Sequence, residues 1–206
     1  MLKFKINVDG QFVNIAENVE IYHKAKLVLG VETLPFKFIT KPLESLFDLG
    51  GTSGSLGTSK EPVNFEVGKA KIAPTICYES IYGDYVTDYV KEGAEALFVI
   101  TNDGRWDNSN GHRQHMYLSS LRAIENRRYV VRSANTGISC FINSRGDIYH
   151  PSSYDEAIAI RDEIYLNHKI TFYTLYGDLI GRISILVSIW LLVSMLANGL
   201  RGGREH

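Results

Sequence analysis

Hydrophobic and polar residues alternate at the start of the chain, and this pattern predicts short strands. The apolar residues of segment 4–8 are separated by polar ones up to the turn dipeptide Asp9-Gly10. Extended patterns resume at residues 12–13 and 19–22. Because period-two alternation around such a dipeptide is typical of paired strands, we expect strands on both sides of this turn.

Prolines and glycines then interrupt the pattern up to residue 59. Pro35 and Pro42 act as breakers within residues 24–42, which predicts a loop. Residues 43–49 are compatible with a short helix, and the Gly- and Ser-rich segment 50–59 predicts an exposed loop. That loop is not a phosphate-binding loop, because no Gly-Lys-Ser/Thr sequence closes it.

From residue 63 onward, strand patterns alternate with helix patterns. The expected strands are 63–67, 71–76, 96–101, 129–133, 138–143 and 158–167, and the expected helices are 82–92 and 114–127. Gly93 is expected to end the first helix, residues 102–112 to form a loop, and residues 145–147 a turn. The second helix should turn four apolar residues inward, namely Met116, Leu118, Leu121 and Ile124. Alternating helices and apolar strands predict a layered α/β fold.

The C-terminal part carries a membrane signal. Residues 183–200 form an 18-residue stretch without a charged side chain, which is long enough to predict a transmembrane helix. The stretch reaches back to Leu179 if Arg182 places its charge at the membrane surface. Tyr173 and Tyr176 precede it and fit an aromatic belt. The alternative is a buried core helix.

The basic residues after this stretch predict its orientation. Arg201 and Arg204 place the C-terminus in the cytoplasm and the preceding domain on the other side. We therefore expect two parts, a domain over residues 1–170 and a membrane helix with a short basic tail over residues 171–206.

Composition adds little beyond a globular class. The 206 residues carry a formal net charge of -1 and are 45% hydrophobic, which suits one folded domain. Lys and Arg form no long cluster, so a nucleic-acid partner is not indicated. The N-terminus lacks the apolar core of a secretory signal. Two cysteines make no disulfide framework, and Cys140, in an apolar run, is expected to be a buried small hydrophobe.

Three polar clusters follow expected strands and offer candidates for catalysis. Cys77 lies between a strand and a helix, where helix N–H groups can stabilise a thiolate or an oxyanion. Lys24 follows a strand-like segment, and a lysine beside a thiol lowers the pKa of that thiol. Asn102 follows the apolar strand 96–101. Taken singly these signals are weak, since strand-end cysteines are common and most lysines lie on the surface.

Taken together, the motifs YHK (22–24), ICYES (76–80) and TNDG (101–104) resemble the nitrilase, or carbon–nitrogen hydrolase, superfamily. That resemblance implies a Glu–Lys–Cys triad on an α-β-β-α sandwich. The chain is more similar still to the apolipoprotein N-acyltransferase family, which shares YHK-x-x-L-V, G-x-E-x-x-P and ICYE. Several downstream motifs also resemble that family in order, so that the similarity covers nearly the whole chain: GHRQH, LRAIENRR, VVRSANTGIS and YGDLIGR.

The resemblance implies roles for particular residues. Cys77 would be the nucleophile, Lys24 its cationic partner and Glu32 an essential carboxylate. Three further residues would bind substrate or support the site, namely Tyr78, Glu79 and Asn102. The implied reaction transfers an acyl group from a phospholipid, through a Cys77 thioester, to the diacylglyceryl-cysteine of a lipoprotein. It would run at the bacterial inner membrane, with the catalytic domain on the periplasmic side.

The implied reaction needs no metal or other cofactor. His112 and His115 are three residues apart but lack an evident third ligand. Metal binding is therefore not expected.

Some features depart from the family pattern. The family's general-base glutamate and its N-terminal membrane helices lie upstream of the position of Lys24, and only 23 residues precede Lys24 here. We therefore expect a fragment, or a truncated product, with an incomplete sandwich. Leu29 stands where a proline is usual, and Arg105 where an aromatic residue is usual. Two other functions remain open: an amidase acting on small amides, and a non-catalytic remnant.

Overall fold

The computed structural model describes residues 21–28, 32, 58–59, 61–106 and 109–198, and the backbone alone of residues 5–8, 11–14 and 199–202. At the N-terminus, β1 (Lys5–Val8) and β2 (Gln11–Asn14) form an antiparallel two-stranded sheet, which confirms strands on both sides of the predicted turn. Residues 21–22 are not in a strand, so that part of the expected strand 19–22 is wrong. The expected short helix and most of the Gly- and Ser-rich loop lie outside the described residues.

The main sheet has six strands in the order β3-β4-β5-β6-β7-β8. Their bounds are β3 (Phe65–Val67), β4 (Ala70–Ile76), β5 (Ala96–Thr101), β6 (Tyr129–Ala134), β7 (Cys140–Ile142) and β8 (Ile148–Tyr149). β4, β5 and β6 are parallel, and the outer pairs are antiparallel. Ile76 pairs with Ile100, so the residues that follow β4 and β5 emerge at the same edge of the sheet.

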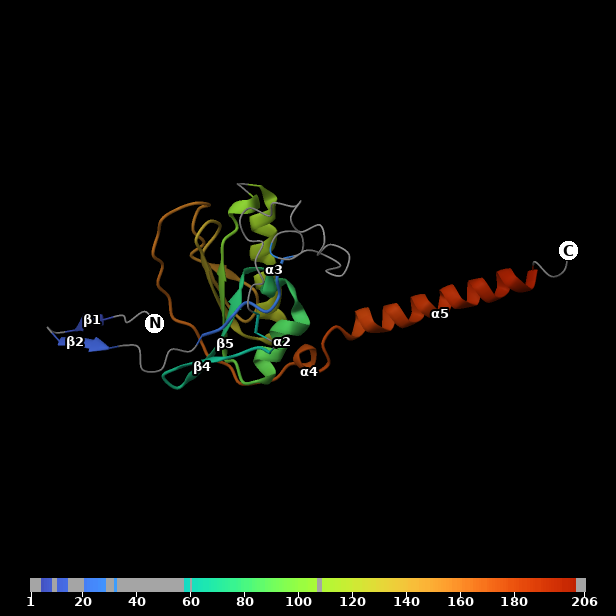
Figure 1. Cartoon of the computed structure of the whole chain (residues 1–206), viewed down its shortest axis with the longest axis horizontal. Coiled ribbons are helices and arrows are strands. Elements are labelled where there is room, and N and C mark those ends of the chain that lie inside the picture. Colours follow the sequence, from blue (N-terminus) through green and yellow to red (C-terminus); the bar gives the residue numbers. More distant parts are fainter. Residues whose placement is uncertain are drawn as a thin grey trace, which may run out of the picture.

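Two helices cover one face of this sheet (Figure 1). α2 (Gly83–Lys91) packs on β4, and α3 (Asn110–Asn126) packs on β6 and β7. α2 buries the apolar side that its sequence predicts, and Gly93 follows it at φ 98°, a conformation that favours glycine. The core between these layers includes Ala73, Tyr89, Leu97, Val99, Val130 and Ile142.

The second helix differs from the prediction in its start and in its inner side. It begins at Asn110, inside the expected loop, because the side chain of Ser109 accepts a hydrogen bond from Gly111 N and caps it. Leu121 and Ile124 are about two-fifths exposed. The buried side is mostly polar instead, with His112, His115, Met116, Ser119, Arg122, Ala123 and Asn126. Apolar periodicity misses such a face, because its side chains are buried through hydrogen bonds.

The expected strand over residues 158–167 is wrong, because residues 150–171 contain no strand. Side chains take the place of a neighbouring strand along this segment. Arg128 Nη1 donates to the carbonyl of Lys169 over 2.8 Å, and Asn167 Nδ2 donates to the carbonyl of Arg127 over 2.8 Å. These bonds hold an extended segment to the domain without a sheet ladder.

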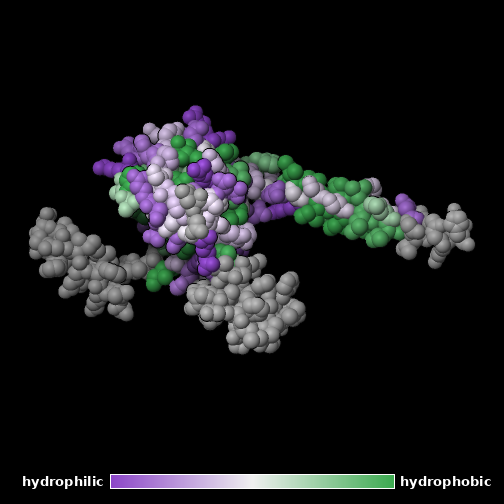
Figure 2. All heavy atoms as spheres, turned by 90° about the horizontal axis from the view of Figure 1, so that it is seen from above, coloured by the Kyte–Doolittle hydropathy of each residue, from purple (hydrophilic) through white to green (hydrophobic). Residues whose placement is uncertain are grey.

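The C-terminal segment forms α4 (Phe172–Tyr176) and α5 (Leu179–Gly202). α5 projects away from the domain (Figure 1), and its surface is largely hydrophobic (Figure 2). Residues Leu179–Asn198 are long and apolar enough to cross a membrane, and none of the most apolar window is buried in the described structure. The alternative of a core helix is therefore wrong.

Short polar contacts join α5 to the domain. Arg182 Nη2 lies 3.3 Å from Asp84 Oδ2 at the start of α2, and Asp178 N donates to Asp84 Oδ1 over 3.3 Å. Gly177 has φ 66°, and a Cβ there would lie 2.5 Å from Asp84 Oδ1. Only glycine therefore fits the junction between α4 and α5 without a shift.

Candidate active site

A cavity of about 750 Å³ opens where β4 and β5 end. Five of the six residues singled out in the sequence line it: Lys24, Glu32, Cys77, Tyr78 and Asn102. The rest of its lining is mostly apolar or aromatic, with Val28, Ile76, Ile100 and Trp106 among its walls. Large concave pockets with a few convergent polar groups are the usual form of small-molecule sites.

Cys77 occupies a tight turn between β4 and α2. It is the first residue of the 3-10 helix η2 (Cys77–Ile81) and has φ 51°, in the left-handed region that residues other than glycine seldom adopt. Its side chain is half-buried, and its thiol is free. A nucleophile on a strained strand-to-helix turn is presented outward at the end of a sheet. This is the position that the sequence predicts for Cys77.

Lys24 and Glu32 form an ion pair with two contacts. Lys24 Nζ lies 2.8 Å from Glu32 Oε1 and 2.7 Å from Oε2. The backbone N–H of Val28 also donates to Glu32 Oε2, over 2.8 Å. The side chain of Lys24 is only 13% exposed, so its charge is directed by this carboxylate more than by solvent. Glu32 thus holds the ammonium group at the wall of the cavity that also contains Cys77.

Glu79 lies behind the cavity wall and is fully buried. Its Oε1 accepts from Tyr22 Oη over 2.6 Å and from the backbone N–H of Ala25 over 2.5 Å. Its Oε2 accepts from Ile76 N over 2.7 Å, directly before the nucleophile. Burial, followed by the hydrogen bond to Glu79, raises the pKa of Tyr22 above its ordinary value, so Tyr22 stays a donor. Glu79 therefore connects the segment that carries Lys24 to the turn that carries Cys77.

The third polar cluster shapes the other wall of the cavity. Asn102 is exposed, and its Oδ1 accepts from Gly104 N over 3.1 Å, which closes the turn after β5. The 3-10 helix η3 (Gly104–Trp106) follows, inside the expected loop, and places the exposed Arg105 on the lining. Tyr78 makes an edge contact with Tyr82, with ring centroids 5.7 Å apart. Leu29 lies outside the described residues.

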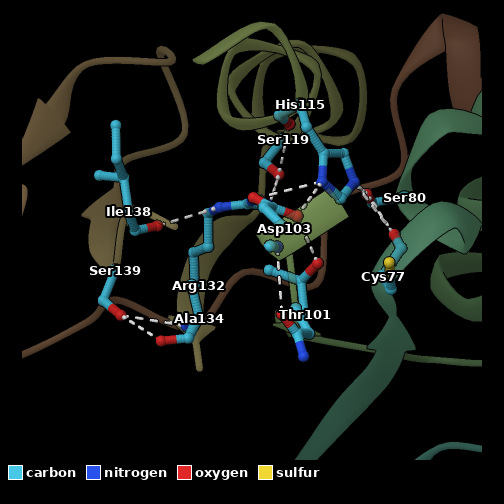
Figure 3. A network of polar contacts seen from close by, with 12 residues as sticks. Cys77, Ser80, Thr101, Asp103, His115, Ser119, Arg132, Ala134, Ile138 and Ser139 are labelled. Carbon is cyan, nitrogen blue, oxygen red and sulfur yellow. Dashed lines mark hydrogen bonds and ion pairs between the residues drawn. The ribbon is translucent and has the colours of Figure 1, made fainter. Parts of the chain in front are cut away.

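A buried polar network, which sequence reasoning missed, lies directly behind Cys77 (Figure 3). His115 Nδ1 lies 2.8 Å from Asp103 Oδ1, and its Nε2 lies 3.2 Å from the carbonyl oxygen of Cys77 and 3.0 Å from Ser80 Oγ. Arg132 Nη2 lies 2.5 Å from the other Asp103 oxygen. The sequence contains both halves of this network, in the motifs TNDG and GHRQH. Their spacing in the sequence does not show that Asp103 and His115 meet in the fold.

The charge of Asp103 is stabilised by its partners. Burial raises the pKa of Asp103, but the hydrogen bond with His115 and the positive charge of Arg132 outweigh burial, so the pKa lies below its ordinary value of 3.8. Thr101 Oγ1 donates to the same carboxylate over 2.8 Å. Asp103 is therefore an ionised acceptor shared by groups from β5, α3 and β6.

The two histidines considered as metal ligands serve other contacts. His115 belongs to the network described above, and the ring of His112 packs against Tyr154 with centroids 4.6 Å apart. Across the described part of the chain, no three His, Cys, Asp or Glu side chains gather as a metal site.

Cys140 is fully buried in β7, as the sequence predicts. Burial raises the pKa of its thiol to about 11, although the charge of Arg132 opposes the shift. Its thiol is therefore protonated and inaccessible, whereas Cys77 is only half-buried.

Comparison with known proteins establishes the family. The carbon-nitrogen hydrolase family model matches residues 6–162. The chain therefore belongs to the carbon-nitrogen hydrolase family, and the resemblance seen in the motifs is confirmed. The predicted α/β fold is confirmed as well, as a mixed sheet covered by helices and followed by one long apolar helix.

Two curated relatives named apolipoprotein N-acyltransferase illustrate the similarity. The protein from Chlorobaculum tepidum is 34% identical over 172 residues, which are 81% of this chain and 32% of the relative. That from Photobacterium profundum is 32% identical over 184 residues, 89% of this chain and 35% of the relative. The chain thus spans about a third of the length of these relatives.

One solved structure with a similar fold is Nit3 from Saccharomyces cerevisiae, a member of branch 10 of the nitrilase superfamily. It is 18% identical, with a TM-score of 0.43, and the match covers 48% of this chain and 40% of Nit3.

Proposed function

We propose that this chain is the catalytic C-terminal portion of an apolipoprotein N-acyltransferase. One observation carries the proposal. In a domain of this family, Cys77 and Lys24 line the same cavity, and the domain is followed by an exposed helix long enough to cross a membrane. Relatives of that name, at 30–34% identity over much of the chain, support it. A lipid-modifying enzyme needs its site close to the bilayer, and α5 provides the attachment.

In the first half-reaction, the thiolate of Cys77 attacks the carbonyl carbon of an acyl ester in a phospholipid. A carbon–sulfur bond forms, and the negative charge collects on the carbonyl oxygen. In this proposal, Lys24 and the backbone N–H of Tyr78 stabilise this oxyanion, and one such donor is worth roughly 3–4 kcal/mol. The carbon–oxygen bond to the lysophospholipid then breaks, the leaving oxygen takes up a proton, and a Cys77 thioester remains.

In the second half-reaction, the α-amino group of a diacylglyceryl-cysteine attacks the thioester carbon. An amide bond forms, the carbon–sulfur bond breaks, and the amine releases a proton. Both half-reactions need a base that accepts and returns protons. Glu32 is the one carboxylate among the described lining residues, and it already accepts hydrogen bonds from Lys24 Nζ and Val28 N. The base in this proposal is a further carboxylate, which the family resemblance places upstream of Lys24.

The proposed location is the bacterial inner membrane, with the catalytic domain on the periplasmic side. Arg201 and Arg204, after the span, support this orientation through the preference of basic residues for the cytoplasm. Of the two tyrosines expected in an aromatic belt, Tyr176 is 53% exposed and stacks on the exposed Phe172, with ring centroids 4.7 Å apart. Tyr173 is partly buried, and its hydroxyl lies against Gly83 of the domain: a Cβ added at that glycine would lie 2.4 Å from Tyr173 Oη. The exposed pair suits the membrane surface.

The cavity favours a phospholipid donor over a small amide. Its size and mostly apolar lining suit an acyl chain more than a group of a few atoms. Arg105 adds an exposed cation on that lining, where a headgroup phosphate can pair with it. In this proposal, the departure from the family's usual aromatic residue alters the contact with the headgroup.

The proposal is tested by mass spectrometry in detergent micelles with phosphatidylethanolamine, on the chain joined to the upstream segment that supplies the proposed base. We expect an acyl adduct on Cys77 that hydroxylamine removes, and its transfer to a synthetic diacylglyceryl-cysteine peptide. Hydrolysis of small amides without an acyl adduct from phospholipid would identify an amidase instead. Absence of both activities would also contradict the proposal and favour the non-catalytic alternative.

A further inference from the structure

His115 joins the carboxylate of Asp103 to the backbone of Cys77. On one side, Nδ1 lies 2.8 Å from the ionised carboxylate of Asp103 and 3.3 Å from Arg132 Nη2. On the other, Ser80 Oγ donates its own hydrogen to the Cys77 carbonyl over 2.8 Å, so Ser80 Oγ and that carbonyl both present lone pairs to Nε2. A proton on Nε2 is therefore donated to these acceptors, because a carbonyl oxygen can only accept.

The network behind the nucleophile is buried and held from several sides. The side chains of Asp103, His115 and Arg132 are at most 1% exposed. Arg132 and Asp103 form an ion pair, and His115 is hydrogen-bonded to the same carboxylate. Because little water competes for these hydrogen bonds, they restrict the position of the His115 ring.

The network also fixes the backbone at Cys77. A residue with φ 51° persists only where its surroundings hold it. The Cys77 carbonyl receives hydrogen bonds from Ser80 Oγ and His115 Nε2, and the orientation of that peptide group also sets the direction of Tyr78 N–H. His115 is itself held by α3, by Asp103 and by an edge contact with Trp106 at 5.3 Å between ring centroids.

We propose that His115, supported by Asp103 and Arg132, is a positioning residue that holds the Cys77 turn in its strained conformation. It touches the nucleophile's backbone and not the substrate. The inference deepens the proposed function and rests on it only for the identity of Cys77 as nucleophile. Any reaction that uses the Cys77 thiolate would depend on it.

The test measures the rate at which iodoacetamide alkylates Cys77, followed by mass spectrometry in the full chain. His115→Ala should lower this rate by about tenfold, because the strained turn loses a hydrogen bond that holds it. His115→Gln can still donate to the Cys77 carbonyl and should recover most of the rate. Recovery by this conservative variant separates positioning from a general loss of structure.

His112→Ala is the matched control, because His112 is also buried on α3 and packs against Tyr154. It should lower thermal stability without changing the alkylation rate of Cys77. An unchanged rate in His115→Ala, no recovery in His115→Gln, or equal losses for His112→Ala and His115→Ala would overturn the inference. If the wild-type protein, tested together with its upstream base, forms no acyl adduct but the alkylation results are as expected, the positioning role stands and the proposed function fails.

Discussion

The hydroxyl of Tyr22 donates to the buried carboxylate of Glu79 over 2.6 Å, across 57 residues of sequence. Tyr22 belongs to the motif that carries Lys24, and Glu79 to the motif that carries Cys77. The same carboxylate receives backbone N–H groups from both segments, at Ala25 and Ile76. One buried acceptor therefore determines how the lysine and the cysteine stand relative to each other.

Replacement of this acceptor should destabilise the domain and disturb the site. Glu79→Gln substitutes one carboxylate oxygen by an amide NH₂, which would face N–H or O–H donors. We expect a loss of about 2–4 kcal/mol in the free energy of unfolding, measured by urea denaturation. Glu92→Gln is the control, because Glu92 is exposed after α2. It should change stability by less than about 0.5 kcal/mol. Equal effects would show that Glu79 does not organise the two segments.

Loss of the lysine should reduce catalysis more than stability. Lys24→Ala removes a proposed oxyanion donor, so thioester formation should slow by about 10²–10³-fold. Glu32→Gln should slow it as well, because the ammonium group would lose the carboxylate that directs it. Lys26→Ala is the matched control, since the nitrogen of Lys26 lies over the ring of Tyr85, 4.9 Å from its centroid. Single-turnover rates that fall equally in Lys24→Ala and Lys26→Ala would contradict the role of Lys24.

The two cysteines should differ in reactivity. At pH 8, iodoacetamide should modify Cys77 and leave Cys140 unmodified, because Cys140 is fully buried and its pKa is raised to about 11. Cys77→Ser should abolish acyl transfer, whereas Cys140→Ser should leave it largely unchanged. Peptide mapping and the adduct assay check both statements. Loss of acyl transfer in both variants alike would overturn the assignment of the nucleophile.

Asp103 should make the domain sensitive to acid. Its pKa in the folded protein is depressed, so its stabilising contribution is fully present above the ordinary value of 3.8 and is lost as pH falls through the folded value. Asp103→Asn should cost about 3–5 kcal/mol at pH 7, because Arg132 and His115 would lose a buried partner. The difference from wild type should shrink below pH 3.

Urea denaturation at pH 7 and at the lowest pH where the protein stays folded measures this difference. Asp147→Asn serves as control, since its ion pair with Arg145 is exposed and should contribute less than about 1 kcal/mol. A constant difference between Asp103→Asn and wild type at both pH values would show that the charge of Asp103 does not stabilise the fold.

α5 should anchor the protein in membranes through its apolar surface. Val187→Asp combined with Leu191→Asp places two charges in the middle of the helix, at an expected cost of about 2.5–3.5 kcal/mol each for insertion. The double variant should be released from membranes by alkaline carbonate, whereas wild type should stay in the pellet. Leu121→Asp is the control, because Leu121 is at an exposed position of α3, and this variant should remain in the membrane pellet as wild type does. Release of wild type itself would contradict the membrane attachment.

The sequence by itself determined the elements whose cores are apolar. The strand over residues 96–101, the inner face of α2 and the terminal helix were predicted well, because local periodicity and length directly report burial or membrane crossing there. The motif set also determined the family, and it placed Cys77 at a strand-to-helix turn.

Only the tertiary structure decided how the polar groups pair. The buried side of α3 is polar, and its partners come from the turn after β5, from η2 and from β6, so no local pattern could identify it. His115 was weighed as a metal ligand from its spacing to His112, yet it binds Asp103 and the Cys77 carbonyl instead. Hydrophobic burial leaves a periodic trace along the chain, whereas a hydrogen bond depends on where two distant segments meet.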